Sequence, residues 1–317
     1  MTDISYRDRQ ALSLGATLYV PADHKDLSYI TSTNKTGARS LVICTEDALS
    51  EENLEKGLEN IEACLPGFMS LAKNGVQVFI RPRSQLVLRR ILEMKGIENA
   101  AGFVLPKFST ENMSDWAAIM THADPLLGVM PTLESADVFC MDNMKAMVQG
   151  LKEGSLANRV VALRIGGNDL LQCLAIRRPR GLTIYDTPVG ALISQLCGVF
   201  KSNGFFLTAP VFEHFEDSEG LLRELALDKA HGLVGKTAIH PSQIGVIESA
   251  LEPTEIEIED ALAILDTEAK AVFKLNGSMC EVATHRYWAQ QVMYLAERQQ
   301  VMKHMFLMCG GKSVGVA

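Results

Sequence analysis

The strongest constraint on the fold is a regular alternation of short apolar runs with longer amphipathic stretches. Each apolar run is nearly continuous in hydrophobic character, as strands buried on both faces tend to be. Eight such runs occur: Ala16–Val20, Arg39–Cys44, Val76–Ile80, Gly102–Leu105, Leu127–Pro131, Val160–Ile165, Gly204–Thr208 and Leu233–Ile239. The helical patterns between them include Glu51–Leu71, Ser84–Lys95, Met113–His122, Ala136–Leu151 and Thr187–Ser202.

This repeated order of strand, helix and strand predicts parallel strands. A period of roughly 31 residues over about 240 residues fits a (β/α)8 TIM barrel, whereas the alternative is an open doubly wound sheet. The open sheet would place a Gly-rich phosphate turn after its first strand, but Pro21-Ala22-Asp23 stands there. We therefore predict an α/β fold, with a TIM-barrel catalytic domain over residues 1–250 and a C-terminal helical extension over residues 251–317.

The extension is acidic, and we predict no strand in it. One helix is predicted to begin after Pro253-Thr254 and to run through Val272, Asn276-Gly277-Ser278 is a turn, and a second helix covers Glu281–Met305. The end of the chain is rich in apolar side chains: Met293, Leu295, Met302, Met305, Phe306 and Met308. Such a surface packs either on its own barrel or on a neighbouring subunit, and the two alternatives stay open.

Charge and composition bear on the class of partner. The chain has 30 Lys+Arg against 38 Asp+Glu, a net charge of −8 without long runs, which favours neither nucleic acid nor anionic lipid. No apolar stretch reaches the roughly 18 residues of a membrane span, and the polar start has no signal-peptide core, so we predict a cytoplasmic protein. Seven cysteines without a CxxC argue against a disulfide framework and a zinc knuckle.

Two carboxylates follow neighbouring predicted strands at the end where TIM barrels carry their chemistry. Glu134 follows Met130-Pro131-Thr132-Leu133, and Asp169 follows Arg164–Asn168. Because adjacent parallel strands lie about 4.8 Å apart, both side chains can reach one hard cation such as Mg²⁺. The alternative is that each carboxylate stabilises the N-terminus of the helix after its strand.

Basic residues also follow the predicted strands. Arg81 comes directly after Val78-Phe79-Ile80, where its planar guanidinium suits a carboxylate or an enolate oxygen, or forms salt bridges to Glu46, Asp47 or Glu134. Lys107 is a Schiff-base candidate or a partner of neighbouring carboxylates. Two further cationic candidates, Lys236 and His240, lie near the last predicted strand. Arg177, Arg178 and Arg180 either bind a phosphate or belong to a solvated loop.

Several segments, in order along the chain, resemble the citrate lyase β-subunit-like branch of the HpcH/HpaI aldolase family. The segment Gly235-Lys236-Thr237-Ala238-Ile239-His240-Pro241 resembles the signature that closes the family's barrel. Five further segments agree: Leu18–Ala22 resembles LFVPG, Thr45–Ala48 resembles LEDAV, Leu105–Lys107 matches LPK, Leu133–Ala136 resembles IETA, and Gly166–Leu170 resembles GxEDL. Arg81-Pro82-Arg83 falls where the family has an arginine.

The resemblance implies a Mg²⁺-dependent TIM-barrel lyase or aldolase that cleaves or forms a β-hydroxy acid or its CoA thioester through a metal-stabilised enolate. It implies Glu134 and Asp169 as metal ligands, and Arg81, Lys107 and Gly167 as substrate-binding residues. It also implies catalytic roles for Arg81, for Glu46 and Asp47, which orient Arg81 and metal-bound water, and for Glu281, an acid or base from a neighbouring subunit.

Two positions depart from the family pattern. Asn168 stands where the family has an acidic residue, and Glu281 stands where a family segment NGKMID has aspartate. Our leading hypothesis is an enzyme that acts on a small carboxylic acid or acyl-CoA as a homotrimer or larger homo-oligomer. The alternative is a catalytically altered member that binds a carboxylate or phosphorylated ligand as a binding or assembly component.

Overall fold

The computed structural model describes the backbone of residues 4–33 and 35–308, and the side chains of these ranges as far as Gln299. The chain divides into two compact units. Tyr6–Leu251 form the first unit, and the described residues on either side of this range form the second.

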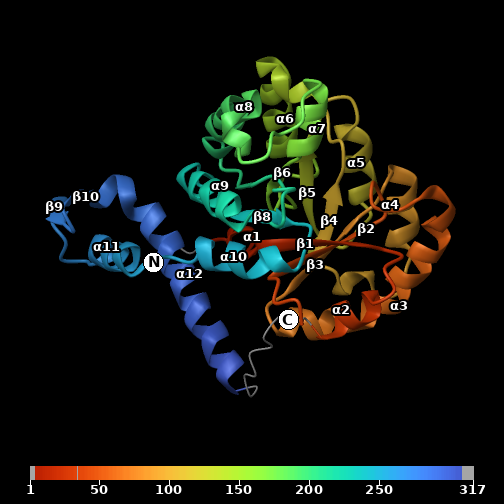
Figure 1. Cartoon of the computed structure of the whole chain (residues 1–317), viewed down its shortest axis with the longest axis horizontal. Coiled ribbons are helices and arrows are strands. Elements are labelled where there is room, and N and C mark those ends of the chain that lie inside the picture. Colours follow the sequence, from red (N-terminus) through yellow and green to blue (C-terminus); the bar gives the residue numbers. More distant parts are fainter. Residues whose placement is uncertain (1–3, 34, 309–317) are drawn as a thin grey trace. The chain divides into compact units, whose positions relative to one another are not determined.

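The first unit is built around eight parallel strands (Figure 1). They are β1 (Gly15–Pro21), β2 (Ser40–Cys44), β3 (Gln77–Arg81), β4 (Gly102–Leu105), β5 (Gly128–Leu133), β6 (Leu163–Ile165), β7 (Leu207–Thr208) and β8 (Gly235–Ala238). The strands pair in the order β7-β6-β5-β4-β3-β2-β1-β8. A bridge between Ala209 and Lys236, with Ala209 N–H donating to Gly235 O at 2.7 Å, links the two outer strands of this order. The predicted TIM barrel is therefore confirmed.

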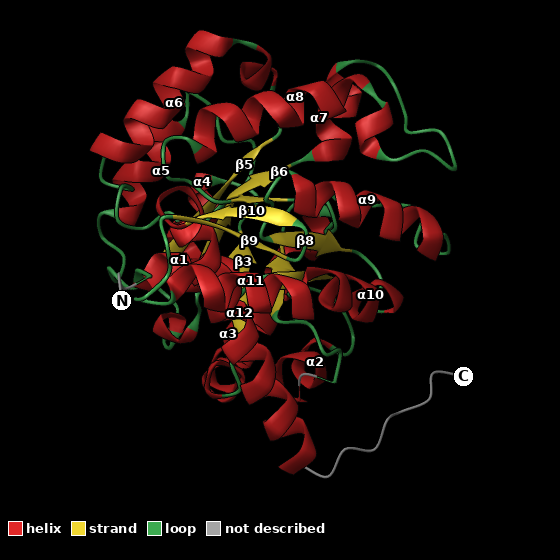
Figure 2. Ribbon diagram, turned by 90° about the vertical axis from the view of Figure 1, so that its left-hand side faces the viewer, coloured by secondary structure: helices red, strands yellow, loops and turns green. Residues whose placement is uncertain are grey.

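Helices surround the ring of strands, as Figure 2 shows. They are α1 (Tyr6–Leu12), α2 (Leu27–Thr33), α3 (Leu54–Lys73), α4 (Gln85–Leu92), α5 (Met113–Met120), α6 (Met141–Glu153), α7 (Gly167–Cys173), α8 (Pro188–Leu196), α9 (Ser218–Ala230) and α10 (Ser242–Leu251). All eight predicted strands overlap an observed one, and the five named helical patterns correspond to α3, α4, α5, α6 and α8. Pro66 lies inside α3.

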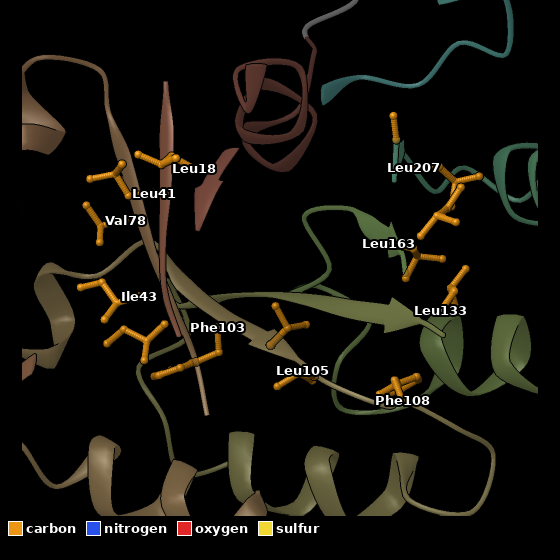
Figure 3. Packing of buried hydrophobic residues seen from close by; sticks show 14 of the residues in the cluster. Leu18, Leu41, Ile43, Val78, Phe103, Leu105, Phe108, Leu133, Leu163 and Leu207 are labelled. Atoms are coloured by element: carbon orange, nitrogen blue, oxygen red, sulfur yellow. The ribbon is translucent and has the colours of Figure 1, made fainter. Parts of the chain in front are cut away.

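Side chains alternate between the two faces of each strand, which separates an apolar outer shell from an interior that contains both apolar and polar side chains. The apolar shell lies between strands and helices, and Figure 3 shows Leu18, Leu41, Ile43, Val78 and Leu163 among its buried members. Because successive side chains in a strand point to opposite faces, the residues between these point into the barrel. The inward set includes Tyr19, Arg81, Thr132, Arg164, Thr208 and Thr237.

The second unit contains α11 (Glu255–Leu265), β9 (Val272–Leu275), β10 (Ser278–Glu281) and α12 (Val282–Met308). A capping box between Thr254 and Glu257 starts α11, as the sequence predicts. A small core of Ala261, Ile264, Cys280, Ala289 and Val292 holds the unit together. Ile256, Leu262, Val272, Met279, Tyr287 and Trp288 remain exposed within the structure described.

Two predictions for this unit are wrong. The extension is not strandless, because β9 and β10 form an antiparallel hairpin whose turn contains Asn276 and Gly277, both with positive φ. An Asn-Gly pair between short runs favours such a hairpin turn. The first helix therefore ends at Leu265 and does not reach Val272, which pairs with Glu281. Of the predicted Met-rich surface, the side chains of Met302, Met305, Phe306 and Met308 lie outside the described ones.

Two further findings concern the described part of the chain. None of its helices combines the length and the apolar character that a membrane span needs. Its six cysteines, Cys44, Cys64, Cys140, Cys173, Cys197 and Cys280, are all free thiols.

Candidate active site

The ends of β2, β3, β4, β5 and β6 bring six of the predicted site residues to the same end of the barrel. Glu46 and Asp47 follow β2, and Arg81 is the last residue of β3. Lys107 follows β4 and Glu134 directly follows β5, whereas Asp169 lies in the first turn of α7, just after β6. Parallel pairing of neighbouring strands places these ends together, as the sequence predicts.

Arg81 is the centre of the cluster. Its Nη2 lies 2.6 Å from Glu46 Oε2, 3.3 Å from Glu134 Oε1 and 3.5 Å from Asp47 Oδ2. Burial opposes the charge of this guanidinium, but Tyr19, Glu134 and Glu46 outweigh it and raise the pKa of Arg81. The arginine therefore stays charged, and the three salt bridges considered for it from the sequence are all present. Its Nε is buried without a hydrogen-bond partner.

Glu134 is almost fully buried at the mouth of the barrel. Its Oε1 accepts a hydrogen bond from the backbone N–H of Lys107 at 2.6 Å and faces Arg81. Burial, opposed by Arg81 and reinforced by the negative charge of Asp169, raises the pKa of Glu134 to about 7. The short helical turn that follows has Ser135 at its N-cap position. The Glu134 side chain therefore interacts with Arg81 and Lys107 and does not cap the following helix.

Lys107 contributes both its backbone and its side chain. Its φ of 48° lies in the left-handed region, which few residues other than glycine adopt. Its Nζ lies 3.3 Å from Glu46 Oε1 and 4.0 Å from Asp47 Oδ1. The charge of Glu46 raises the pKa of Lys107, so the ammonium form is favoured over the amine that a Schiff base requires.

The donor set of this cluster suits a hard divalent cation. Four carboxylates, those of Glu46, Asp47, Glu134 and Asp169, gather around the two cations Arg81 and Lys107. Burial and, after it, the charge of Asp47 raise the pKa of Asp169, whereas Arg81 and Lys107 oppose the rise. Among the described side chains, no three His, Cys, Asp or Glu residues are grouped so that they could together hold a metal ion, so a cation here would have fewer than three such ligands. Two carboxylates leave positions for water and substrate oxygens, as Mg²⁺ sites commonly do.

Gly167 and Glu281 are the other two predicted site residues. Gly167 begins α7, and a Cβ there would lie 2.7 Å from side-chain atoms of Ile184 and of Pro210. The space beside this glycine is therefore already filled by neighbouring side chains. Glu281 ends β10 in the second unit, where its backbone N–H donates to His285 Nδ1 at 3.2 Å.

Four of the basic candidates do not join the cluster. Lys236 points out of the barrel, because its neighbour Thr237 points in, and it is buried against Glu224 and Asp228 of α9. Arg178 is likewise buried against Glu224 rather than solvated. The exposed Arg177 and Arg180 line a separate open pocket, with His214 and Phe215 among its other residues.

His240 also stays apart from the cluster. Its exposed ring stacks on Phe215, and Nδ1 lies 2.8 Å from Ser242 Oγ. His240 is therefore a loop histidine with local contacts.

Sequence reasoning missed a polar layer inside the barrel. Thr132, Arg164 and Thr208 are neighbours on β5, β6 and β7, and the Arg164 side chain also donates a hydrogen bond to Thr237. The available signal was a charged residue in the middle of the apolar run Val160–Ile165, since an arginine is rarely buried in a strand without a partner.

The barrel and its cluster of carboxylates around an arginine define a class of protein, the TIM-barrel enzymes that do their chemistry at the C-terminal ends of the strands. The sequence profile described as "C-C_Bond_Lyase of the TIM-Barrel fold" matches residues 8–301. The chain therefore belongs to this family, and the relatives below confirm the resemblance to citrate lyase β subunits.

Characterised relatives show how far the similarity extends. The chain is 27% identical over 135 residues to the citrate lyase subunit beta of Haemophilus influenzae, covering 39% of this chain and 44% of that protein. It is 28% identical over 181 residues to a (3S)-malyl-CoA thioesterase of Cereibacter sphaeroides, covering 54% of each. The chain thus spans about half the length of these relatives. A mitochondrial citramalyl-CoA lyase of Rattus norvegicus is 26% identical over 308 residues, 89% of this chain and 85% of that protein.

Solved structures support the fold. The protein CitE from Mycobacterium tuberculosis, crystallised with magnesium, acetoacetate and coenzyme A, superposes with a TM-score of 0.65. The two are 19% identical, and the match covers 90% of this chain and 98% of that one. A malate synthase of Haloferax volcanii also matches, with a TM-score of 0.65 and 13% identity over 94% of this chain and 92% of that one.

Proposed function

We propose that this protein is a Mg²⁺-dependent carbon–carbon lyase or aldolase acting on a small β-hydroxy acid or its CoA thioester. The observation that carries the proposal is the cluster in which Arg81 faces Glu46, Asp47 and Glu134 beside Asp169, at the end of the barrel where this family's fold places its chemistry. The names of the relatives, citrate lyase, citramalyl-CoA lyase and malyl-CoA thioesterase, support the substrate class.

In this proposal, Glu134 and Asp169 hold the cation. A bound Mg²⁺ supplies Lewis acidity toward a substrate carbonyl or hydroxyl oxygen. Arg81 binds the substrate's carboxylate or stabilises the enolate charge that develops as the carbon–carbon bond breaks. The salt bridge from Glu46 fixes the orientation of Arg81, and the backbone N–H of Lys107 fixes one oxygen of Glu134. The Lys107 ammonium, which is largely exposed, offers a further positive charge to an incoming carboxylate.

The second unit has a proposed role in assembly. Its exposed apolar side chains, among them Met279, Tyr287 and Trp288, suit a contact with a second copy of the chain in a homotrimer or larger homo-oligomer. In such an assembly, Glu281 of one subunit acts as the acid or base at the site of another. Sedimentation or light scattering tests the assembly, and a monomer at micromolar concentration contradicts it.

Metal binding tests the proposed function most directly. Mn²⁺ in place of Mg²⁺ allows the site to be followed by electron paramagnetic resonance, which does not depend on knowing the substrate. We expect Glu134→Gln and Asp169→Asn each to weaken Mn²⁺ binding at least about 10-fold. Asp142→Asn serves as the control, because Asp142 is an exposed carboxylate of α6. Equal Mn²⁺ affinity in all four proteins contradicts the metal site.

The reaction itself is tested by a Mg²⁺-dependent retro-aldol assay. Citramalyl-, malyl- and citryl-CoA and free hydroxy-keto acids form the substrate panel, with Glu134→Ala and Glu281→Ala as variants. The lyase proposal is supported if the wild type cleaves one of these substrates and Glu134→Ala does not. Mn²⁺ binding without cleavage of any substrate in the panel favours instead the alternative of a catalytically altered family member that only binds its ligand. The observation that favours this alternative is the exposed Asn168, which replaces the family's acidic residue.

A further inference from the structure

Arg164 is a buried cation inside the barrel, and among the described side chains it has no anionic partner. It is the central residue of β6 and only 2% exposed, and its neighbours Leu163 and Ile165 pack in the outer apolar shell. Its Nη2 donates to Thr237 Oγ1 at 2.5 Å, and its Nη1 donates to Thr17 Oγ1 at 3.4 Å. No carboxylate oxygen lies within 4.0 Å of this guanidinium among the side chains that the structure describes.

This arrangement is unusual for a buried arginine. Burying a charge is costly unless hydrogen bonds and an opposite charge compensate it. Arg178 in the same unit meets that requirement with Glu224 at 2.6 Å. Arg159 donates to the backbone oxygens of Ala123, Asp124 and Leu127. Arg164 instead has two hydroxyls and the face of Tyr19, whose ring centroid lies 5.3 Å from its Cζ.

The strands beside Arg164 add two unused hydroxyl groups. Parallel pairing places Thr132 of β5 and Thr208 of β7 directly beside Arg164, so all three side chains share the inward face. The Oγ1 atoms of Thr132 and Thr208 are both buried and have no hydrogen-bond partner within the described part of the chain. A guanidinium flanked by free hydroxyl donors is the arrangement that receives a carboxylate.

The position of this layer relates it to the candidate metal site. Thr132 precedes Glu134 by two residues on the same face of β5, which places Arg164 about 6.6 Å below the layer of Glu134. A four- or five-carbon dicarboxylate has its two ends separated by a comparable distance. Tyr19 and Thr237, which contact the guanidinium, are both partly exposed, so the layer is not sealed.

We propose that Arg164, with Thr132, Thr208 and Thr237, binds the second carboxylate of the substrate and selects a dicarboxylic oxo or hydroxy acid over a monocarboxylic one. This inference rests on the proposed function, in which the first carboxylate of the substrate is bound by Arg81 beside the cation that Glu134 and Asp169 hold. It specifies the acid fragment: one that carries an additional carboxylate, rather than a pyruvate- or glyoxylate-like fragment.

Malate and lactate test the proposal, because both are 2-hydroxy acids and only malate has a second carboxylate. Calorimetric titration in the presence of Mg²⁺ is expected to show at least about 10-fold tighter binding of malate by the wild type. Arg164→Met is expected to remove most of this preference and leave lactate binding unchanged. Thr208→Val, which removes only the hydroxyl, is expected to reduce the preference in part.

Arg159→Met is the matched control, because Arg159 is also buried but its partners are backbone carbonyls. It is expected to keep the preference for malate. Thermal unfolding without ligand separates binding from structure: Arg164→Met is expected to unfold within a few degrees of the wild type, since no carboxylate loses its partner. A large fall in the unfolding temperature with an unchanged preference means that Arg164 is structural and overturns the proposal.

The remaining outcomes separate this proposal from the proposed function. Equal Mg²⁺-dependent affinity of the wild type for malate and lactate overturns the dicarboxylate site alone. Absence of any Mg²⁺-dependent binding of either acid, together with unchanged Mn²⁺ binding in Glu134→Gln, overturns both.

Discussion

Lys236 Nζ lies 2.8 Å from Glu224 Oε1, and both side chains are fully buried between β8 and α9. The other oxygen of the same carboxylate lies 2.6 Å from Arg178 Nη1 and also accepts from the backbone N–H of Ile184 at 2.7 Å. The Glu224 carboxylate of α9 therefore connects β8 with the long segment that follows α7. The lysine of the segment that resembles the family signature is structural in this protein.

Glu224→Gln is expected to destabilise the barrel strongly. The substitution keeps the shape of the side chain but leaves Lys236 and Arg178 buried beside a neutral group. Removing one partner of a buried ion pair costs about 3–5 kcal/mol in the free energy of unfolding. Urea denaturation measures the change, with the exposed Glu219→Gln on the same helix as the control. A loss below about 1 kcal/mol, the range of surface pairs, contradicts this role.

The fold of the barrel is predictable from the sequence because each strand is short, apolar and buried on both sides. The second unit is less predictable, because its hairpin has four residues in each strand and only a few of their side chains are buried. Val272 fits the end of an amphipathic helix as well as a strand. The decisive local signal is Asn276-Gly277, whose positive φ angles demand a hairpin turn.

The candidate site was predictable where polar residues follow strand ends, as Arg81 and Glu134 do. The prediction failed within strands, because a residue's face depends on register. Lys236 and Thr237 are adjacent, yet one points to α9 and the other into the barrel. The left-handed conformation of Lys107, which aims its N–H at Glu134, also has no sequence signal, since lysine rarely adopts it.

Gly166→Ala is expected to impair the metal site, at some cost to the stability of the barrel. Its φ of −86° suits alanine, but a Cβ there would meet the Cβ of Glu134 and lie 2.6 Å from Glu134 Oε2. The Glu134 carboxylate must therefore move, and we expect Mn²⁺ affinity to fall at least about 10-fold. Gly245→Ala in α10 is the control, because a Cβ there meets nothing within 4 Å. That variant is expected to bind Mn²⁺ normally and to be stabilised by about 0.5–1 kcal/mol. Normal Mn²⁺ binding in both variants contradicts the placement of Glu134 at the metal.

Lys107→Met is expected to weaken substrate binding rather than abolish chemistry. The Lys107 ammonium lies near Glu46 and is largely exposed, so it contributes charge and not a nucleophile. We expect KM to rise about 5- to 10-fold, with kcat reduced less than about 10-fold. Borohydride treatment of the wild type with substrate, followed by mass spectrometry, is expected to show no adduct. A covalent adduct at Lys107, together with loss of kcat, contradicts the metal-dependent mechanism. Lys145→Met, at an exposed lysine of α6, controls for the loss of a surface charge.

Mixed oligomers test whether Glu281 acts on a neighbouring subunit. Arg81→Met removes the centre of the cluster in the barrel, whereas Glu281→Gln alters only the end of β10 in the second unit. If a site combines the barrel of one subunit with Glu281 of another, the two inactive variants complement each other because some mixed sites contain both native residues. Co-expression with two affinity tags isolates the mixed oligomers. In a mixed homotrimer one of the three sites contains both native residues, so about a third of wild-type kcat is expected to return. If each site uses its own Glu281, every mixed site lacks one native residue, and no activity returns. Glu281→Asp is expected to retain more activity than Glu281→Gln, because a carboxylate can still transfer the proton whereas an amide cannot.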